Sequence, residues 1–283
     1  MFEHTVVAAH FGSASALLLD NLDELRERGT RELTLVNVLL SHHTDAASEE
    51  HRAEVRRRLE EEADELRRAG FEVHVELRSG QPAHEVATIA RARGASLILA
   101  GTRGEQYFRE FLRGSTVLQL LRRATTPVLL EPIESETRTV TGRGFSDLLL
   151  ATDFSASARD AETMALQLAE KARRLTVLHV VEEEESERIG QAKAEANARA
   201  GLEAIVARAP TAIADRLRTR VVTGTPSREI VQTANEVGAT MLVMGKRGRS
   251  PVQELLLGST TQRTVRQASH SLLVVPSTYG RIV

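Results

Sequence analysis

Short apolar runs and amphipathic stretches alternate along the whole chain. In its second half, residues 147–152 and 240–244 are apolar runs of strand length, and residues 155–172 carry Ala and Leu at helical spacing. The same pattern predicts further strands at 175–181, 217–223 and 272–275 and further helices at 186–209, 226–237 and 258–268. Strands that are apolar throughout are typical of a parallel sheet buried on both faces, so the pattern predicts an α/β fold.

The first half of the chain repeats this pattern at an offset of about 144 residues. Residues 97–104, for example, match residues 241–248. An internal repeat of this length indicates a duplicated domain. We expect one domain at 1–133 and a second at 146–283, joined by a linker at 134–145 whose Ser, Thr and Gly show neither strand nor helix periodicity.

Each copy is therefore predicted to be a doubly wound, Rossmann-like domain with a five-stranded parallel sheet flanked by helices. Ligands of such sheets bind beyond the carboxyl ends of the strands, at the point where the strand order reverses. Candidate ligand-binding residues should therefore follow the first, second and fourth strands of each copy.

Two glycine pairs with the same spacing follow the fourth strand of each copy. In the second copy they are Gly245-Lys246-Arg247-Gly248 and Gly258-Ser259-Thr260-Thr261, and in the first copy Gly101-Thr102-Arg103-Gly104 and Gly114-Ser115-Thr116-Val117. Glycine allows the main chain to approach an anion, and the amino end of the next helix favours negative charge by about 0.3–1 kcal/mol. A phosphate cradle and ordinary turn glycines both fit one loop alone, but the repeated position favours the cradle.

Composition and missing motifs exclude several classes of protein. The P-loop spacing G-x-x-x-x-G-K-[ST] is absent, and the first strand-to-helix turns lack G-x-G-x-x-G. The chain has no Cys, which excludes Cys-ligated metals and thiol nucleophiles, and we predict no metal site. A formal net charge of −2 and 3% aromatic residues argue against nucleic acid as a partner. Without a basic leader or a long uncharged apolar run, we expect a cytoplasmic protein with no membrane span.

The spacing G-x2-G-x9-G-[ST] after the fourth strand, with Thr152-Asp153-Phe154-Ser155 closing the first strand, resembles the universal stress protein family in its tandem two-domain form. The resemblance covers nearly the whole chain. It implies the strand order 3-2-1-4-5 and binding of ATP or AMP, with or without Mg²⁺. It also implies that the two domains associate through their fifth strands as an internal pseudo-dimer, which could assemble further into a homodimer.

Carried over to this sequence, the resemblance implies a nucleotide site in the second copy. Asp153 would contact the adenosine, Val180 would line the adenine pocket, and Met244 and Gly245 would flank the ribose and base. Ala151 and Thr152, beside Asp153 in the sequence, are implied as binding residues at the same place. The residues implied at the phosphates are Arg247, Gly248, Gly258, Ser259, Thr260 and Thr261. The alternative role for Asp153 is that of a turn or helix N-cap residue.

The first copy departs from this motif at two places. His10 stands where the second copy has Asp153, and Val117 stands where it has Thr261. An imidazole thus replaces a carboxylate, and an apolar group replaces a hydroxyl. The weaker candidate site of the first copy consists of His10, Val38, Gly101, Arg103, Gly104, Gly114, Ser115 and Thr116. We expect nucleotide mainly in the second copy, while the first binds weakly, binds another ligand or serves as the pairing partner.

Three functions remain open at this point. The first is a stress-response or regulatory protein whose bound nucleotide biases its contacts with other, unidentified proteins. The second is a ligand-independent interaction module of the same fold, and the third is an enzyme such as a slow ATP hydrolase. The sequence has no G-x-S-x-G elbow and no evident carboxylate pair for metal-assisted phosphoryl transfer, so no catalytic residue is predicted and at most a weak ATPase is expected.

Overall fold

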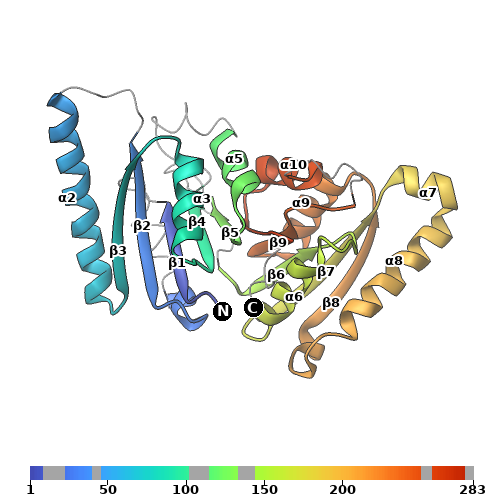
Figure 1. The fold of residues 1–283 in the computed structure, drawn as a ribbon. Helices are drawn as coiled ribbons and strands as arrows, with labels where there is room; N and C mark the ends of the chain where they lie inside the picture. Colours follow the sequence, from blue (N-terminus) through green and yellow to red (C-terminus); the bar gives the residue numbers. More distant parts are fainter. Residues whose placement is uncertain (9–22, 40–45, 102–114, 133–143, 250–256, 278–283) are drawn as a thin grey trace. The chain divides into compact units, whose positions relative to one another are not determined.

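The computed structural model describes residues 1–8, 23–39, 46–101, 115–132, 144–249 and 257–277 (Figure 1). The chain divides into two compact units, Met1–Arg138 and Thr139–Val283. Each unit carries five parallel strands flanked by helices. The division between the units falls within the predicted linker at 134–145.

The first unit has the strand order β3-β2-β1-β4-β5, and all of its strand pairs are parallel. Its strands are β1 (His4–Ala8), β2 (Glu32–Leu39), β3 (Glu72–Ser79), β4 (Leu97–Gly101) and β5 (Val128–Glu131). Its helices within the described residues include α2 (Ala46–Arg68), α3 (Pro82–Ala92) and α5 (Ser115–Arg123).

The second unit repeats this topology in the order β8-β7-β6-β9-β10. Its strands are β6 (Asp147–Ala151), β7 (Arg174–Val181), β8 (Leu217–Thr223), β9 (Met241–Gly245) and β10 (Ser271–Val275). Its helices are α6 (Arg159–Ala169), α7 (Glu183–Ile189), α8 (Gln191–Val206), the 3-10 helix η1 (Thr211–Arg216), α9 (Pro226–Val237) and α10 (Ser259–Gln267). The predicted α/β class and the order 3-2-1-4-5 are confirmed for both copies.

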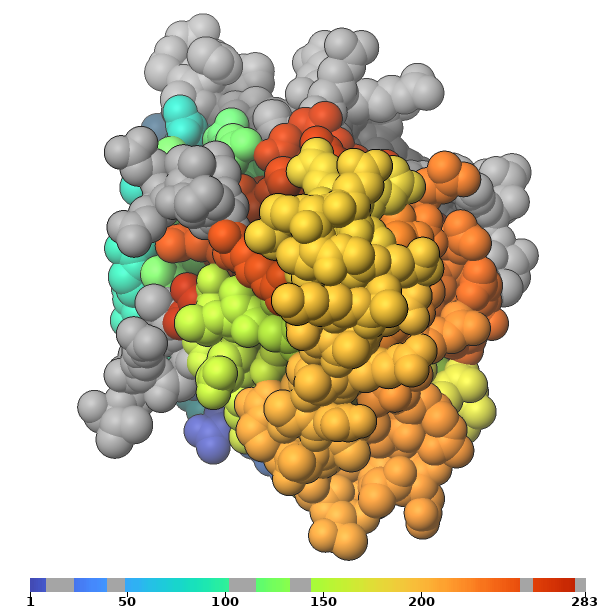
Figure 2. All heavy atoms as spheres, turned by 90° about the vertical axis from the view of Figure 1, so that its right-hand side faces the viewer, coloured from blue at the N-terminus to red at the C-terminus, as the bar shows by residue number. Residues whose placement is uncertain are grey.

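The apolar runs of the second unit form its core. All five residues of β9 and of β10 are buried, as an apolar strand between helical layers requires. Helix α8 packs against this sheet through Ala194 and Ala198, which lie with Val181 of β7 in one hydrophobic cluster. Figure 2 views the unit from the side on which α7 and α8 run across its surface. The small Ala side chains let α8 lie close to the strands.

Two helix boundaries differ from the sequence prediction. The single helix expected at 186–209 is two helices, because Gly190 has φ +85° and ψ 138°, which a helix cannot contain. The helix expected to begin at residue 155 begins at Arg159. Residues 152–158 instead form a loop after β6, in which Phe154 has a left-handed φ of +61°. None of the helices in the described part of the chain is long and apolar enough to cross a membrane.

Candidate functional site

The candidate site of the second unit lies at the carboxyl ends of β6 and its two neighbours. β6 pairs with β7 on one side and with β9 on the other, so the strand order reverses at β6. The loops that follow β6 and β9 therefore leave the same edge of the sheet at adjacent positions. Ligands of doubly wound folds bind at this kind of switch point.

The loop after β6 is held by its own hydrogen bonds. Thr152 N donates to Leu178 O of β7 at 3.0 Å, which extends the strand pairing by one residue. Phe154 N donates to Thr152 Oγ1 at 3.0 Å, and Ser155 N donates to Asp153 Oδ1, also at 3.0 Å. The Thr and Asp side chains thus form the short turns that such residues favour. Asp153 does act as a turn residue, which was the alternative role considered for it.

The carboxylate of Asp153 also joins the loop after β6 to the loop after β9. Its Oδ2 accepts a hydrogen bond from Arg249 N at 2.6 Å. A Cβ atom at Gly248 would lie only 2.3 Å from the same oxygen, so the contact requires glycine at this position. The structure therefore brings Asp153 and Gly248 together, as expected of residues that share a site.

A pair of stacked rings supports the loop after β6. The rings of Phe154 and His179 stack with centroids 4.3 Å apart, and His179 Nδ1 donates to Thr152 O at 2.8 Å. Phe154 in turn lies against Gly201 of α8, where a Cβ would come within 2.6 Å of the ring. Burial lowers the pKa of His179, although its bond to the Thr152 carbonyl opposes this. This pair was not predicted from the sequence, because it joins two segments that are far apart along the chain.

The loop after β9 is tied to α10 and β10. Lys246 N donates to Val275 O at 2.8 Å, and Gly258 N donates to Lys246 O at 3.0 Å. Thr261 Oγ1 donates to Gly245 O at 2.9 Å. Residues 245–249 and 258–261 are therefore neighbours at the amino end of α10, while residues 250–256 lie outside the described part of the chain.

Thr261 has a different contact from the one implied by the resemblance. Its side chain is buried, and its hydroxyl is directed at the carbonyl of Gly245 rather than outward. In the first unit, Val117 is buried at the matching position and has no hydroxyl to make such a bond. The side chain at this position thus bonds to the end of the fourth strand in the second copy and has no group to do so in the first.

Positive charge and unpaired donors gather around Gly258. The main-chain N–H groups of Ser259, Thr260 and Thr261 have no acceptor within the described residues. Arg247 Nε is buried and likewise lacks an acceptor in this part of the chain. Burial, and then the nearby charge of Arg247, lower the pKa of Lys246 to about 8. An anion at the amino end of α10 would satisfy the main-chain donors at low cost, because these N–H groups already lie together at that end of the helix.

The fold explains the glycine at position 248 but not the glycine at position 258. The contact of Gly248 with Asp153 is explained by folding alone. Gly258 is the N-cap of α10, with φ −65° and ψ 146°, a conformation that any residue adopts. Its Cβ would make only ordinary contacts, the nearest at 3.5 Å. The fold therefore does not require glycine at 258, whereas a ligand that approaches the main chain would.

Most of the other predicted site residues lie near the ends of strands or at the start of a helix. Val180 and Met244 are buried near the ends of β7 and β9, Thr152 is buried, and Ala151 is half-buried at the end of β6. In the first unit, Val38 lies in β2, Gly101 ends β4, and Ser115 and Thr116 begin α5. The remaining candidates of the first unit lie outside the described residues: His10, Arg103, Gly104 and Gly114.

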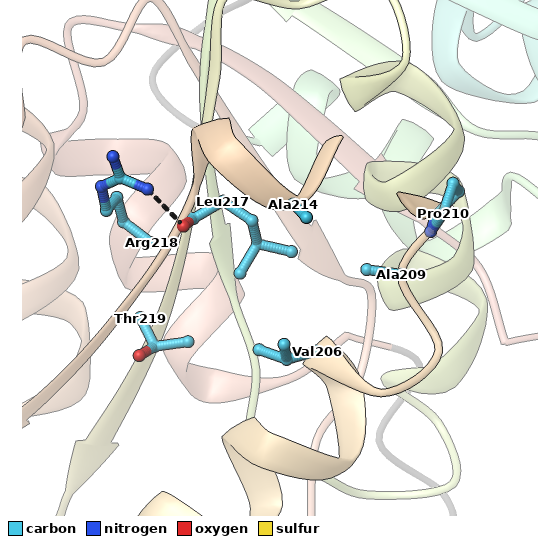
Figure 3. A pocket seen from close by; sticks show the side chains of 7 residues that line it. All are labelled: Val206, Ala209, Pro210, Ala214, Leu217, Arg218 and Thr219. Atoms are coloured by element: carbon cyan, nitrogen blue, oxygen red, sulfur yellow. Dashed lines mark hydrogen bonds between the residues drawn. The ribbon is translucent and has the colours of Figure 1, made fainter. Parts of the chain in front are cut away.

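Two other features of the described residues bear on ligand binding. No group of three or more His, Asp or Glu side chains there could hold a metal ion. A cavity of about 410 Å³ lies at the amino end of β8, whereas the loops described above follow the carboxyl ends of β6 and β9 (Figure 3). Val206, Ala214 and Leu217 point into this cavity, whereas Arg218 points away from it. The cavity is a separate, apolar depression.

Comparisons with known proteins agree with this architecture. The sequence model of the universal stress protein family matches residues 1–132 and 144–276. Universal stress protein YxiE of Bacillus subtilis is 27% identical over 146 residues, which cover 46% of this chain and 99% of YxiE. Universal stress protein MJ0577 of Methanocaldococcus jannaschii is 36% identical over 55 residues, 19% of this chain and 34% of that protein. The crystal structure of a universal stress protein from Archaeoglobus fulgidus covers 96% of each chain at 23% identity, with a TM-score of 0.72, and so shares the fold.

Proposed function

Because this chain belongs to the universal stress protein family, in its tandem two-domain form, we propose that its second unit binds an adenine nucleotide, ATP or AMP. The nucleotide would lie across the carboxyl ends of β6, β7 and β9, with its phosphates at the amino end of α10. The observation that carries the proposal is the group of donors around Gly258 that have no acceptor among the described residues.

The phosphates would be held mainly by the main chain. The N–H groups of residues 259–261 point out of the amino end of α10, where the helix dipole favours negative charge. Gly258 allows close approach, Arg247 supplies a guanidinium donor, and Lys246 adds positive charge while it is protonated. Any Mg²⁺ would arrive with ATP and be held largely by its phosphates and water, as this ion prefers.

The nucleoside would lie against the loop after β6. Val180 and Met244 offer apolar surface near the strand ends, and Asp153 offers a carboxylate that can accept from a ribose hydroxyl or the adenine amino group. Since Asp153 Oδ2 holds Arg249 N in this structure, the nucleoside would share or replace that bond. Binding is therefore expected to move Arg249.

Such a movement would connect the nucleotide to the protein surface. Arg249 is exposed, and its Nη1 lies 3.6 Å from Glu185 Oε2 of α7. The first turn of α7 is acidic, and most of the helix is exposed (Figure 2). We propose that the nucleotide changes the surface formed by Arg249 and α7, and that partner proteins of this stress-response family member recognise that change.

Thermal unfolding with ATP, ADP and AMP tests this function. A nucleotide at 100 times its Kd should stabilise the protein by about 2.7 kcal/mol. Gly258→Val should remove the shift, because its branched side chain would fill the space over the amino end of α10.

Gly238→Ala is the matched control for that variant. Gly238 ends α9 with φ +61° and has no atom within 4 Å of a built Cβ. The substitution should lower stability by about 1 kcal/mol and keep the nucleotide shift. If the unaltered protein shows no shift with any of the three nucleotides, the ligand-independent interaction module is the better explanation.

A further inference from the structure

A buried carboxylate lies beneath the loop after β6. Glu162 belongs to the face of α6 that packs on the sheet, among apolar neighbours such as Ala161 and Ala165, and it is 3% exposed. Burying a carboxylate among apolar groups is costly unless its oxygens accept hydrogen bonds. Its presence on this face therefore calls for an explanation from its contacts.

Both oxygens of Glu162 accept hydrogen bonds from defined donors. Thr152 Oγ1 donates to Oε1 at 2.7 Å, and Arg208 Nη2 donates to Oε2. Arg208 follows the end of α8, and its Nε also donates to Ala204 O in the last turn of that helix at 3.3 Å. The guanidinium thus supplies the charge that a buried carboxylate needs and ties it to α8.

The bond from Thr152 to Glu162 determines which partner the Thr152 hydroxyl donates to and which it accepts from. Since its hydrogen goes to Glu162, its oxygen is left to accept the N–H of Phe154 at 3.0 Å. Phe154 has a φ of +61°, which is strained for a bulky residue and persists only when neighbours enforce it. The bond to Thr152 and the stack on His179 are two such constraints.

The conformation at Phe154 in turn directs Asp153. Asp153 lies between Thr152, which is bonded to Glu162, and Phe154, which is bonded to Thr152. Its carboxylate reaches Arg249 N in the other loop. A chain of direct contacts therefore runs from Arg208 at the end of α8 to the loop that carries Gly248.

We propose that Glu162 is a positioning residue of the nucleotide site: together with Arg208, it holds the Thr152 hydroxyl and thereby the Asp153 carboxylate in the geometry that receives the nucleotide. This inference rests on the proposed function. It adds a specific determinant of affinity that touches no part of the ligand, and it makes α8 a support of the site.

A buried carboxylate elsewhere in the same unit provides a matched control. Asp147 lies at the amino end of β6, the end opposite to the site, and accepts hydrogen bonds from Arg173 Nε at 3.1 Å and Nη2 at 2.6 Å. The side chains of Asp147 and Glu162 are each 5% exposed. If Glu162 had a merely structural role, substituting either carboxylate would have the same effect on ATP affinity.

The experiment compares Glu162→Gln with Asp147→Asn in the full chain, by calorimetric titration with ATP and by thermal unfolding. The Gln amide has a single oxygen, so it can accept from Arg208 or from Thr152 but not from both at separate oxygens. If its oxygen keeps Arg208, its NH2 group faces Thr152 Oγ1, whose hydroxyl must then turn away from the arrangement it has beside Glu162. Both variants should melt at lower temperature than the unaltered protein. Only Glu162→Gln should weaken ATP binding, by about tenfold.

A double-mutant cycle tests whether Glu162 acts through Thr152. Thr152→Val should weaken ATP binding, Thr152→Ser should keep it, and Glu162→Gln in the Thr152→Val protein should cause no further loss. Should Glu162→Gln fail to fold, Arg208→Gln takes its place, because this side chain is 38% exposed and should be tolerated.

The outcomes separate this inference from the function on which it rests. If the unaltered protein binds ATP and Glu162→Gln, or Arg208→Gln in its place, binds it equally well, the positioning role is wrong and the proposed function stands. Equal loss of affinity in Asp147→Asn would also overturn it, since that result indicates general destabilisation. If the unaltered protein binds no adenine nucleotide, the proposed function itself fails.

Discussion

At the amino end of β6, the buried carboxylate of Asp147 accepts hydrogen bonds from Ser146 and Arg173, and Asp147 N donates to Thr240 Oγ1. At the carboxyl end of the same sheet, by contrast, Arg247 Nε and the first N–H groups of α10 have no acceptor within the described residues. The same strands thus connect one end where this carboxylate is paired to another where several donors around one helix terminus have no acceptor among the described residues. Single buried nitrogens without a partner in this part of the chain, Arg216 Nε and His270 Nδ1, also lie just before β8 and β10. Unpaired buried donors cost stability, so the gathering of several of them at the amino end of α10 favours a ligand there.

Backbone conformation differs between the two ends in the same way. The left-handed Phe154 and the close contact of Gly248 with Asp153 both occur at the carboxyl end. Strained residues of this kind persist where the surrounding structure enforces them, and they cluster at functional sites. We therefore assign stability mainly to the amino end of the sheet and binding to its carboxyl end. Variants at each end can test this division.

The largest effect is expected where α8 supports the binding end. Gly201→Ala would place a methyl group about where the Phe154 ring now lies, since the built Cβ is 2.6 Å from Cε2. Overpacking of this kind should lower the free energy of unfolding by about 2 kcal/mol. Displacement of Phe154 should also weaken ATP binding by about tenfold, as measured by calorimetric titration.

Gly190→Ala is the control for the helix itself. Gly190 has φ +85° and no atom within 4 Å of a built Cβ, so Ala there strains the α7–α8 junction without touching Phe154. It should lower stability and leave ATP affinity unchanged. A Gly201→Ala protein that is destabilised but binds ATP normally would show that α8 does not support the site.

A matched pair of Thr→Val variants gives a smaller effect at each end. Thr261→Val removes the bond to Gly245 O and makes the second copy resemble the first at Val117. It should cost about 1 kcal/mol of stability and weaken ATP binding about fivefold. Thr240→Val removes the bond from its hydroxyl to Gly144 O, 2.7 Å long at the amino end, and also the acceptor of Asp147 N. It should therefore cost more stability than Thr261→Val, with no change in affinity. Equal ATP affinity in both variants would contradict the division between the ends.

The fold could be predicted from the sequence because its signals are local. Apolar runs such as 147–151 and 241–245 are strands whatever their neighbours, and the internal repeat gives every element a second copy. The break at Gly190 was not predicted, since one glycine within an Ala-rich polar stretch costs a helix only about 1 kcal/mol. Contacts of Ile189 and Ala194 with the cluster around Val181 are tertiary and are not visible in the local pattern.

The site was predictable only in part, for a similar reason. The glycine spacing correctly places residues 245–248 beside residues 258–261, because a strand and the next helix are joined by that loop. Glu162 and Arg208 are 46 residues apart, so their pairing depends on how α6 and α8 pack. The direction of the Thr261 hydroxyl likewise follows from the close approach of α10 to β9, which spacing alone does not specify.

The smallest effect concerns the charge of Lys246 at the binding end. Its pKa is lowered to about 8 in the folded protein, so between about pH 8 and its ordinary pKa of 10.5 the unfolded chain binds more protons than the folded one. The cost of burying the charged Lys246 is therefore fully present below about pH 8 and disappears as the pH rises to 10.5. The free energy of unfolding should rise with pH through this window. The affinity for phosphate should change in the opposite direction, because the charge that attracts it disappears above pH 8.

We expect ATP affinity to fall about threefold between pH 7 and pH 9.5, which corresponds to about 0.7 kcal/mol for the charge of Lys246. The phosphates of ATP keep their charge in this range, since their last pKa lies near 6, so calorimetric titration reports the protein group. Lys246→Met should bind more weakly at pH 7 and lose the pH dependence, whereas Lys171→Met, an exposed lysine beyond the end of α6, should keep it. If Lys246→Met shows the same fall as the unaltered protein, another group titrates at the site, and the charge at this end of the sheet must be assigned to that group instead.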